Sequence, residues 1–190
     1  MKKLFAFGLS GLAAVIATAI LVAPALGTGT RAAVVQGETI ASAQDSVDLA
    51  KAFLVSLKYP TPQHALAAGY VLDSPCVSDP VLGGMGVHFA HLGLMADPAI
   101  DVTKPEVLVY NFTRGGQLRL SALEYFRRAA DQTPPFDESD KPTLFGTPFD
   151  GIMPPHAPHH GWHYDLHLWI WDFNPSGILF PFNPSVHCPA

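Results

Sequence analysis

The sequence predicts one α+β domain in which N-terminal helices pack on an antiparallel, barrel-like β-sheet, with a long proline-rich loop over one end. Three observations lead to this fold class. Apolar residues recur at helical spacing before residue 69, whereas β-rich runs follow Cys76. Residues 127–161 contain seven prolines and no clear periodicity, which is typical of a long loop. The 190 residues suit a single domain, and a hydrophobic fraction of 48% is sufficient for a core.

The N-terminus has the features of a secretory signal peptide. Two lysines are followed by an apolar stretch from Leu4 to Val22 and by the A-x-A pattern of Ala23–Ala25. We therefore expect residues 1–25 to be a cleaved signal peptide, residues 26–38 a flexible leader, and residues 39–190 a single secreted domain. Because about 20 apolar residues can also span a bilayer, an uncleaved membrane anchor is the alternative to a secreted or periplasmic location.

Cleavage would leave an acidic protein with two cysteines. The precursor has a net charge of −5, and loss of Lys2 and Lys3 leaves 9 basic against 16 acidic residues, a net charge of −7. Without a basic patch, the mature chain is a poor partner for nucleic acids or anionic membranes. In an oxidising compartment Cys76 and Cys188 most simply form a disulfide, and two free buried thiols are the alternative. The composition does not indicate an oligomeric state.

Two helices are predicted before the sheet. Residues 39–57 form an amphipathic helix that ends before Pro60, and its apolar side chains at helical spacing are Val47, Ala50, Phe53, Leu54 and Leu57. The Thr61-Pro62 pair is typical of a helix start. His64–Ala68 is therefore expected to be a short second helix.

A β-hairpin is predicted where Arg114-Gly115-Gly116 separates two β-rich runs. If the two glycines are the central turn residues, Arg114 faces Gln117 and Val107 faces Glu124. Glu124 then shares a sheet face with four apolar side chains, which are Leu118, Leu120, Ala122 and Phe126. A carboxylate in such a place needs a partner or a metal, because its burial alone is costly.

Five of the nine histidines lie between residues 156 and 167, and the last two belong to the strongest predicted strand, residues 162–171. Alternation along this strand puts His163, Asp165 and His167 on one face. Residues four apart on a strand are separated by about 13 Å, so one ion cannot bind both histidines without a bend or bulge. A neighbouring pair, at about 7 Å, can converge on one ion. The loop histidines His156, His159 and His160 are expected at the surface, where they could close over the site as a lid.

A glycine-rich run adds a further histidine. Gly83–Gly86 lead into His88 and His91, which point to opposite faces of an extended strand, and the glycines favour His88 as the inward residue. We therefore predict a site of nitrogen and oxygen ligands suited to Zn, Cu, Fe, Mn or Ni. Its ligands are His88, Glu124, His163 and His167, with Asp165 as a ligand or an orienting group. The alternatives are a metal-free polar pocket and a purely structural hydrogen-bond network.

Other functions have weaker support in the sequence. It contains no nucleophile elbow, P-loop or dinucleotide-binding glycine pattern, so whether the protein is an enzyme stays open. A non-catalytic binding module for a small apolar or aromatic ligand is the second hypothesis, based on Trp162, Trp169 and Trp171 beside Tyr164. The third hypothesis is an envelope interaction protein that uses the same aromatic residues as a partner surface.

An ordered set of short motifs resembles a family of exported bacterial proteins of unknown function. The set comprises Ala67–Tyr70, Cys76-Val77, Gly84–His88, Pro105–Tyr110, Glu124-Tyr125, Leu144–Gly151, His163–Trp169 and Asn183–Pro189. Its His-Tyr-Asp-Leu-His run is also similar to the TTHB210-like (DUF5602) proteins. The likeness spans residues 65–189 and implies that the site residues belong to one domain with a cysteine near each end, but it implies no reaction.

Overall fold

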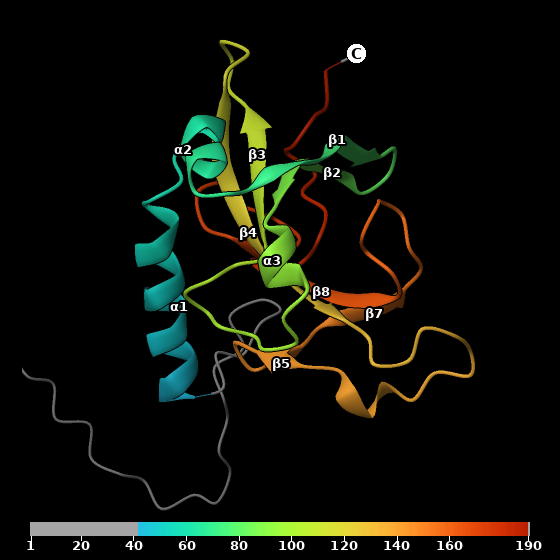
Figure 1. Cartoon of the computed structure of the whole chain (residues 1–190). Helices are drawn as coiled ribbons and strands as arrows, with labels where there is room; N and C mark the ends of the chain where they lie inside the picture. The colour runs from blue at the N-terminus through green and yellow to red at the C-terminus, as the bar shows by residue number, and fades with distance from the viewer. Residues whose placement is uncertain (1–41, 190) are drawn as a thin grey trace, which may run out of the picture. The chain divides into compact units, whose positions relative to one another are not determined.

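The computed structural model describes residues 42–189, and the predicted signal peptide, the leader and the start of the first predicted helix lie outside them. Six antiparallel strands form one curled sheet, a half-barrel, in the order β1-β2-β3-β4-β8-β7 (Figure 1). The predicted α+β class with a barrel-like sheet is confirmed. The strands are β1 (Val71–Asp79), β2 (Gly83–Ala90), β3 (Val107–Phe112), β4 (Leu118–Arg128), β7 (Asp150–Met153) and β8 (His163–Trp169).

In the described part of the chain, three α-helices accompany the sheet, and they are α1 (Ala43–Ser56), α2 (Pro62–Ala67) and α3 (Leu92–Met95). Helix α1 begins after Ser42, whose hydroxyl accepts a hydrogen bond from the backbone N–H of Asp45. The predicted second helix, His64–Ala68, is present as α2, but it starts two residues earlier, at Pro62 after Thr61. Within residues 42–189, no helix is both long and apolar enough to cross a membrane.

The face of α1 that packs on the sheet differs from the predicted one. Ala52, Val55 and Ser56 are buried. The predicted apolar stripe is largely exposed, with exposed fractions of 49% for Val47, 43% for Phe53, 62% for Leu54 and 50% for Leu57. The small side chains allow the helix to lie close to β4, which leaves the larger ones on the outside.

The proline-rich segment before β8 is ordered and contains secondary structure of its own. It holds the short 3₁₀ helix η1 (Glu138–Asp140), a small hairpin of β5 (Thr143–Leu144) and β6 (Thr147–Pro148), and the edge strand β7. Phe145 and Phe149 from this segment are buried in the main core. The loop therefore wraps on the sheet, as expected, although its short strands were not predicted.

The hairpin between β3 and β4 has a different turn from the predicted one. Thr113, not Arg114, pairs with Gln117, and Gly116 closes a three-residue loop with a positive φ of 74°. Further along, Tyr110 faces Leu120 while Val109 faces Ala122, so Ser121 is an extra, bulged residue in β4. The bulge compensates for the longer loop. Val107 consequently faces Glu124, as predicted.

The bulge also changes the neighbours of Glu124. Leu118 and Leu120, which were predicted on its face, pack instead in the main core with Leu123 and Tyr125. Ala122 and Phe126 stay on the side of Glu124, where the side chains of β4 alternate regularly beyond the bulge. The sheet therefore has one apolar face against the helices and one face that carries the polar site.

The predicted disulfide between Cys76 and Cys188 is present and joins β1 to the C-terminal segment, across a sequence separation of 112 residues. The same segment pairs with β2 through a bridge between Gly84 and Asn183. A Cβ atom on Gly84 would lie 2.6 Å from Val186 Cγ1, so glycine is needed for this close approach. The C-terminal segment is thus held beside β1 and β2.

Removal of the disulfide should destabilise the domain. In the chain-entropy model, a bond that closes a loop of this length contributes about 4 to 5 kcal/mol to the free energy of unfolding. We expect the Cys76→Ser/Cys188→Ser variant to unfold at a clearly lower urea concentration than the oxidised wild type, and reduced wild type to behave like the variant. Equal urea midpoints for all three samples would contradict this role.

Candidate metal centre

Three strands bring one carboxyl group and two imidazoles together on the polar face of the sheet. Glu124 of β4 faces His167 of β8 directly, and His88 of β2 reaches Glu124 across β3 because the sheet is curled. Glu124 Oε2 lies 3.6 Å from His88 Nε2 and 3.7 Å from His167 Nε2. One ligand atom from each residue lies within 4.8 Å of the other two, so these side chains could hold a metal ion.

The three side chains are buried, and several of their polar atoms have no hydrogen-bond partner. The exposed fractions are 6% for His88, 5% for Glu124 and 1% for His167. Glu124 Oε2 and both ring nitrogens of His167 are buried and have no hydrogen-bond partner among residues 42–189. Buried polar atoms normally have partners, so these lone pairs mark a place where an ion would satisfy several groups at once.

His88 is oriented by a neighbour on β1. Its Nδ1 lies 3.0 Å from Ser74 Oγ. With the ring proton on Nδ1, the hydroxyl accepts a hydrogen bond and the Nε2 lone pair faces Glu124. A hydrogen bond of this kind fixes both the tautomer and the ring position, which a metal ligand requires.

Glu124 and Asp165 form a buried acidic pair. Burial, and then the negative charge of Asp165, raises the pKa of Glu124 well above its ordinary value. Burial, and then the charge of Asp150, also raises the pKa of Asp165. The contact between the two carboxyl groups raises the pKa of Glu124 and lowers that of Asp165, as expected if protonated Glu124 donates to the Asp165 carboxylate. The pair thus retains a proton near neutral pH, and Asp165 contacts the candidate ligand Glu124 without belonging to the three-residue group.

The two imidazoles of the centre are neutral. Burial lowers the pKa of His88 to about 4 and that of His167 to about 3. Each ring therefore carries a single proton near neutral pH, and with that proton on Nδ1 the Nε2 lone pair is available to an ion. The group can offer two neutral nitrogens and, once Glu124 releases its proton, one negative oxygen.

The structure does not bring His163 to this centre. His163 and His167 share a face of β8, as predicted, but His163 lies with His156 and His160 in a second group. This separation agrees with the strand spacing that argued against one ion for both. The predicted surface position is wrong for His160, which is 4% exposed because it packs on Phe126 and pairs with Asp73 of β1.

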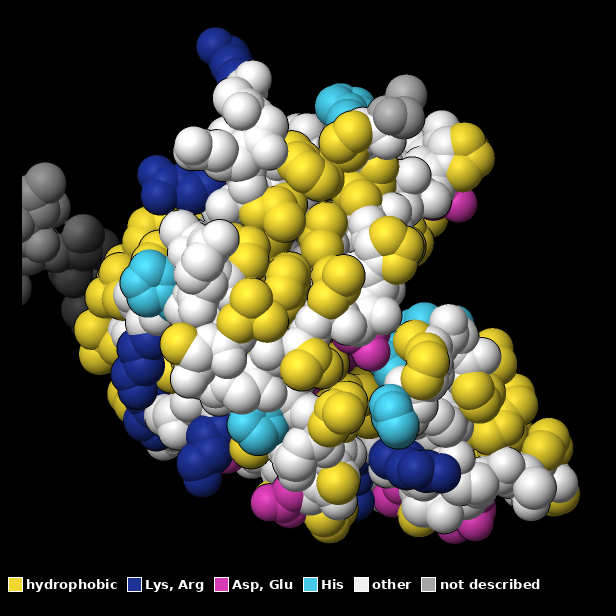
Figure 2. Space-filling view, turned by 45° about the horizontal axis from the view of Figure 1, so that its top comes forward, with side chains coloured by type: hydrophobic (Ala, Val, Ile, Leu, Met, Phe, Trp, Pro, Cys, Tyr) yellow, Lys and Arg dark blue, Asp and Glu magenta, His cyan; other side chains and the backbone are white. Residues whose placement is uncertain are grey.

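Both histidine groups border one cavity of about 360 Å³. His88, Glu124 and His167 line it together with His156 and His160, and its apolar lining includes Val77, Met85, Val107, Met153 and Phe182. Figure 2 shows a hollow on one side of the domain with histidine and acidic side chains at its edge. A small ligand could therefore enter beside a bound ion.

The three tryptophans do not form one aromatic pocket. Trp162 packs on Phe136, Trp171 packs on Phe53 of α1, and buried Trp169 donates from Nε1 to the carbonyl of Phe180.

No family model, curated protein or solved structure matches the chain. The basis for a function is therefore the geometry of the site itself.

The shared proton of Glu124 and Asp165 predicts a pH dependence of stability in metal-free protein. Unfolded carboxyl groups ionise below about pH 5, whereas the folded pair keeps a proton, because burial raises the pKa of both groups. Stability that depends on this proton is present at low pH and lost as the pH rises. A Glu124→Gln variant can keep the hydrogen bond through its amide but cannot titrate.

We expect the free energy of unfolding of wild type, relative to Glu124→Gln, to fall as the pH rises above about 5, by at most about 1.4 kcal/mol per pH unit for one proton. Histidine contributions of opposite sign are common to both proteins and cancel. Urea unfolding in the presence of EDTA measures the difference, and the exposed Glu138→Gln variant should follow wild type. A difference between wild type and Glu124→Gln that is constant with pH would contradict the shared proton.

Proposed function

We propose that the protein is an exported metal-binding protein whose centre consists of His88, Glu124 and His167. The observation that carries this proposal is the convergence of three buried ligand atoms from three different strands, with unpaired lone pairs at Glu124 Oε2 and His167 Nε2. The disulfide between Cys76 and Cys188 supports export, because such bonds persist in oxidising compartments.

The distances favour an ion over a metal-free hydrogen-bond network. Separations of 3.6 and 3.7 Å between Glu124 Oε2 and the two imidazole nitrogens are too long for good hydrogen bonds. They suit an oxygen and a nitrogen that both bind the same ion, since ligand bonds to zinc are about 2.1 Å long. A network that served only structure would be expected to pair these atoms directly.

The donor set favours Zn²⁺ or Fe²⁺. Two imidazoles and one carboxylate form the protein ligands of many open zinc sites and of non-haem iron centres. Three protein ligands leave at least one position on the ion for water or a small ligand. Ser74 at His88 and Asp165 at Glu124 supply the supporting contacts that such ligands usually have.

The cavity beside the centre favours a second candidate function, the binding of a small apolar ligand. Its lining is mostly apolar around a few polar groups, which is typical of ligand pockets. A ligand held by Met85, Met153 and Phe182 would remain bound after the histidines are replaced. Variants in which the histidines are replaced therefore distinguish the two functions, because they should lose the metal and keep the apolar ligand.

The test is the metal content and Zn²⁺ affinity of the exported protein, purified from metal-replete cells. We expect His167→Ala and His88→Ala each to remove one equivalent of metal. Loss of a hydrogen bond that supports a metal ligand costs roughly 10- to 100-fold in metal affinity. Loss of a ligand itself should lower the Zn²⁺ affinity of this centre by more than that. His64→Ala is the matched control, because His64 is exposed on α2 and belongs to neither histidine group.

Elemental analysis and isothermal titration with Zn²⁺ provide the two measurements. Wild type that is metal-free and shows no rise in melting temperature with Zn²⁺ would overturn the proposal. So would His88→Ala and His167→Ala variants that bind as much Zn²⁺ as the His64→Ala control.

A further inference from the structure

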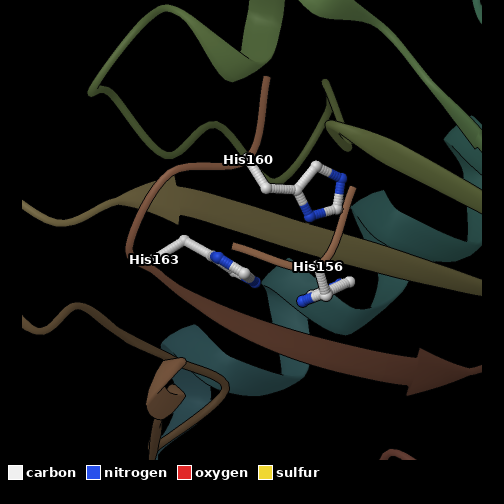
Figure 3. A group of neighbouring side chains, drawn as sticks. All are labelled: His156, His160 and His163. Atoms are coloured by element: carbon white, nitrogen blue, oxygen red, sulfur yellow. The ribbon is translucent and has the colours of Figure 1, made fainter. Parts of the chain in front are cut away.

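A second group of histidines lies at the start of β8 and in the loop before it. Figure 3 shows His156, His160 and His163 with their rings turned toward one another. The ring centroids are 4.6 Å apart for His156 and His160, 4.9 Å for His156 and His163, and 5.1 Å for His160 and His163. One nitrogen from each ring lies within 4.8 Å of the other two.

Each ring of this group has one nitrogen beside an oxygen acceptor. His163 Nδ1 lies 2.9 Å from the carbonyl of Gly161, and His156 Nδ1 lies 3.3 Å from that of Pro154. His160 Nε2 lies 3.1 and 3.2 Å from the two carboxylate oxygens of Asp73. A ring proton on each of these nitrogens leaves the lone pair of the other nitrogen free for an ion.

The free nitrogens of the two inner rings are buried and unpaired. His163 is fully buried and His160 is 4% exposed, and within the described residues neither His163 Nε2 nor His160 Nδ1 has a hydrogen-bond partner. Two buried nitrogens without partners, next to a third imidazole, point to a ligand that binds lone pairs. A network of mutual hydrogen bonds would have used them.

The protein holds the two inner rings firmly. His163 stacks on Phe126 at 4.7 Å, and His160 meets the edge of the same ring at 5.3 Å. Gln132 fixes the chain between them, because its amide accepts from the backbone N–H of Trp162 and donates to the Trp162 carbonyl. The third ring, His156, is exposed, and its contacts are a long hydrogen bond at the Pro154 carbonyl and the rings of His160 and His163.

We propose that His156, His160 and His163 form a second metal site for a late divalent transition-metal ion, with Asp73 positioning His160. Three neutral imidazoles are the ligand set of well-known zinc sites with an open fourth position, and imidazole also binds Cu²⁺ strongly. Ligand bonds of about 2.1 Å allow two nitrogens to be at most about 4 Å apart. The three candidate nitrogens already lie within 4.8 Å of one another, so small adjustments of the rings would bring them to this separation.

The second site is distinct from the centre at Glu124. His163 and His167 are four residues apart on β8, which corresponds to about 13 Å along a strand. Ions that act together on one bond are usually about 3.5 to 4 Å apart, so the two sites would act as separate centres. Both border the same cavity, because His156 and His160 line it with His88 and Glu124.

The experiment uses Cu²⁺ as the probe and counts equivalents by elemental analysis and electron paramagnetic resonance. We expect wild type to bind two equivalents and His156→Ala to bind one. A His88→Ala/His167→Ala variant should retain one equivalent with nitrogen hyperfine splitting, which addition of His156→Ala removes. Asp73→Asn should weaken this remaining equivalent by roughly 10- to 100-fold, in line with other residues that orient ligands.

His159→Ala is the matched control, because His159 is exposed in the same loop and lies outside the group. Equal loss of Cu²⁺ in His159→Ala and His156→Ala would overturn the proposal, since it would indicate unspecific binding by loop histidines. A folded His88→Ala/His167→Ala variant without bound Cu²⁺ would also overturn it. If that variant does not fold, an unchanged count in His156→Ala decides against the site. If His156→Ala loses one equivalent of Cu²⁺ and His88→Ala/His167→Ala loses none, the result would support this site and contradict the centre at Glu124.

Discussion

Glu124 places a carboxyl group on a buried face of the sheet, and the rest of the polar site depends on how this group is compensated. An isolated buried carboxylate is strongly unfavourable. Here the pairing of β4 with β8 sets His167 opposite Glu124, and the curl of the sheet brings His88 to the same oxygen. Without an ion, burial and the charge of Asp165 raise the pKa of Glu124, which favours its neutral form, and a bound ion would replace that proton.

Much of this arrangement could be predicted from the sequence, because it follows from strand alternation. The common face of His163, Asp165 and His167 follows from a period of two residues. The facing of Val107 and Glu124 was predicted from the hairpin turn, and the inward position of His88 from the glycines before it. The bulge at Ser121 could not be predicted from this period. It results from a three-residue turn, and it moves Leu118 and Leu120 to the opposite face while the register at Glu124 is kept.

The second histidine group was not predicted because its contacts join segments that are distant in sequence. Asp73 and His160 are 87 residues apart. Phe126 of β4 packs on the rings of His160 and His163. A proline-rich loop has no period from which a buried position could be read. The prediction of which face of α1 is buried was also wrong. Small residues at Ala52 and Ser56 pack more closely on β4 than the larger apolar residues of the helix can.

The most direct test of the central claim is anomalous X-ray diffraction from crystals of the exported protein grown with Zn²⁺. We predict a zinc peak between His88 Nε2, Glu124 Oε2 and His167 Nε2, about 2.1 Å from each atom. Data on both sides of the zinc absorption edge would identify the ion. The absence of a zinc peak at these three atoms, in crystals where the side chains are well ordered, would contradict the account.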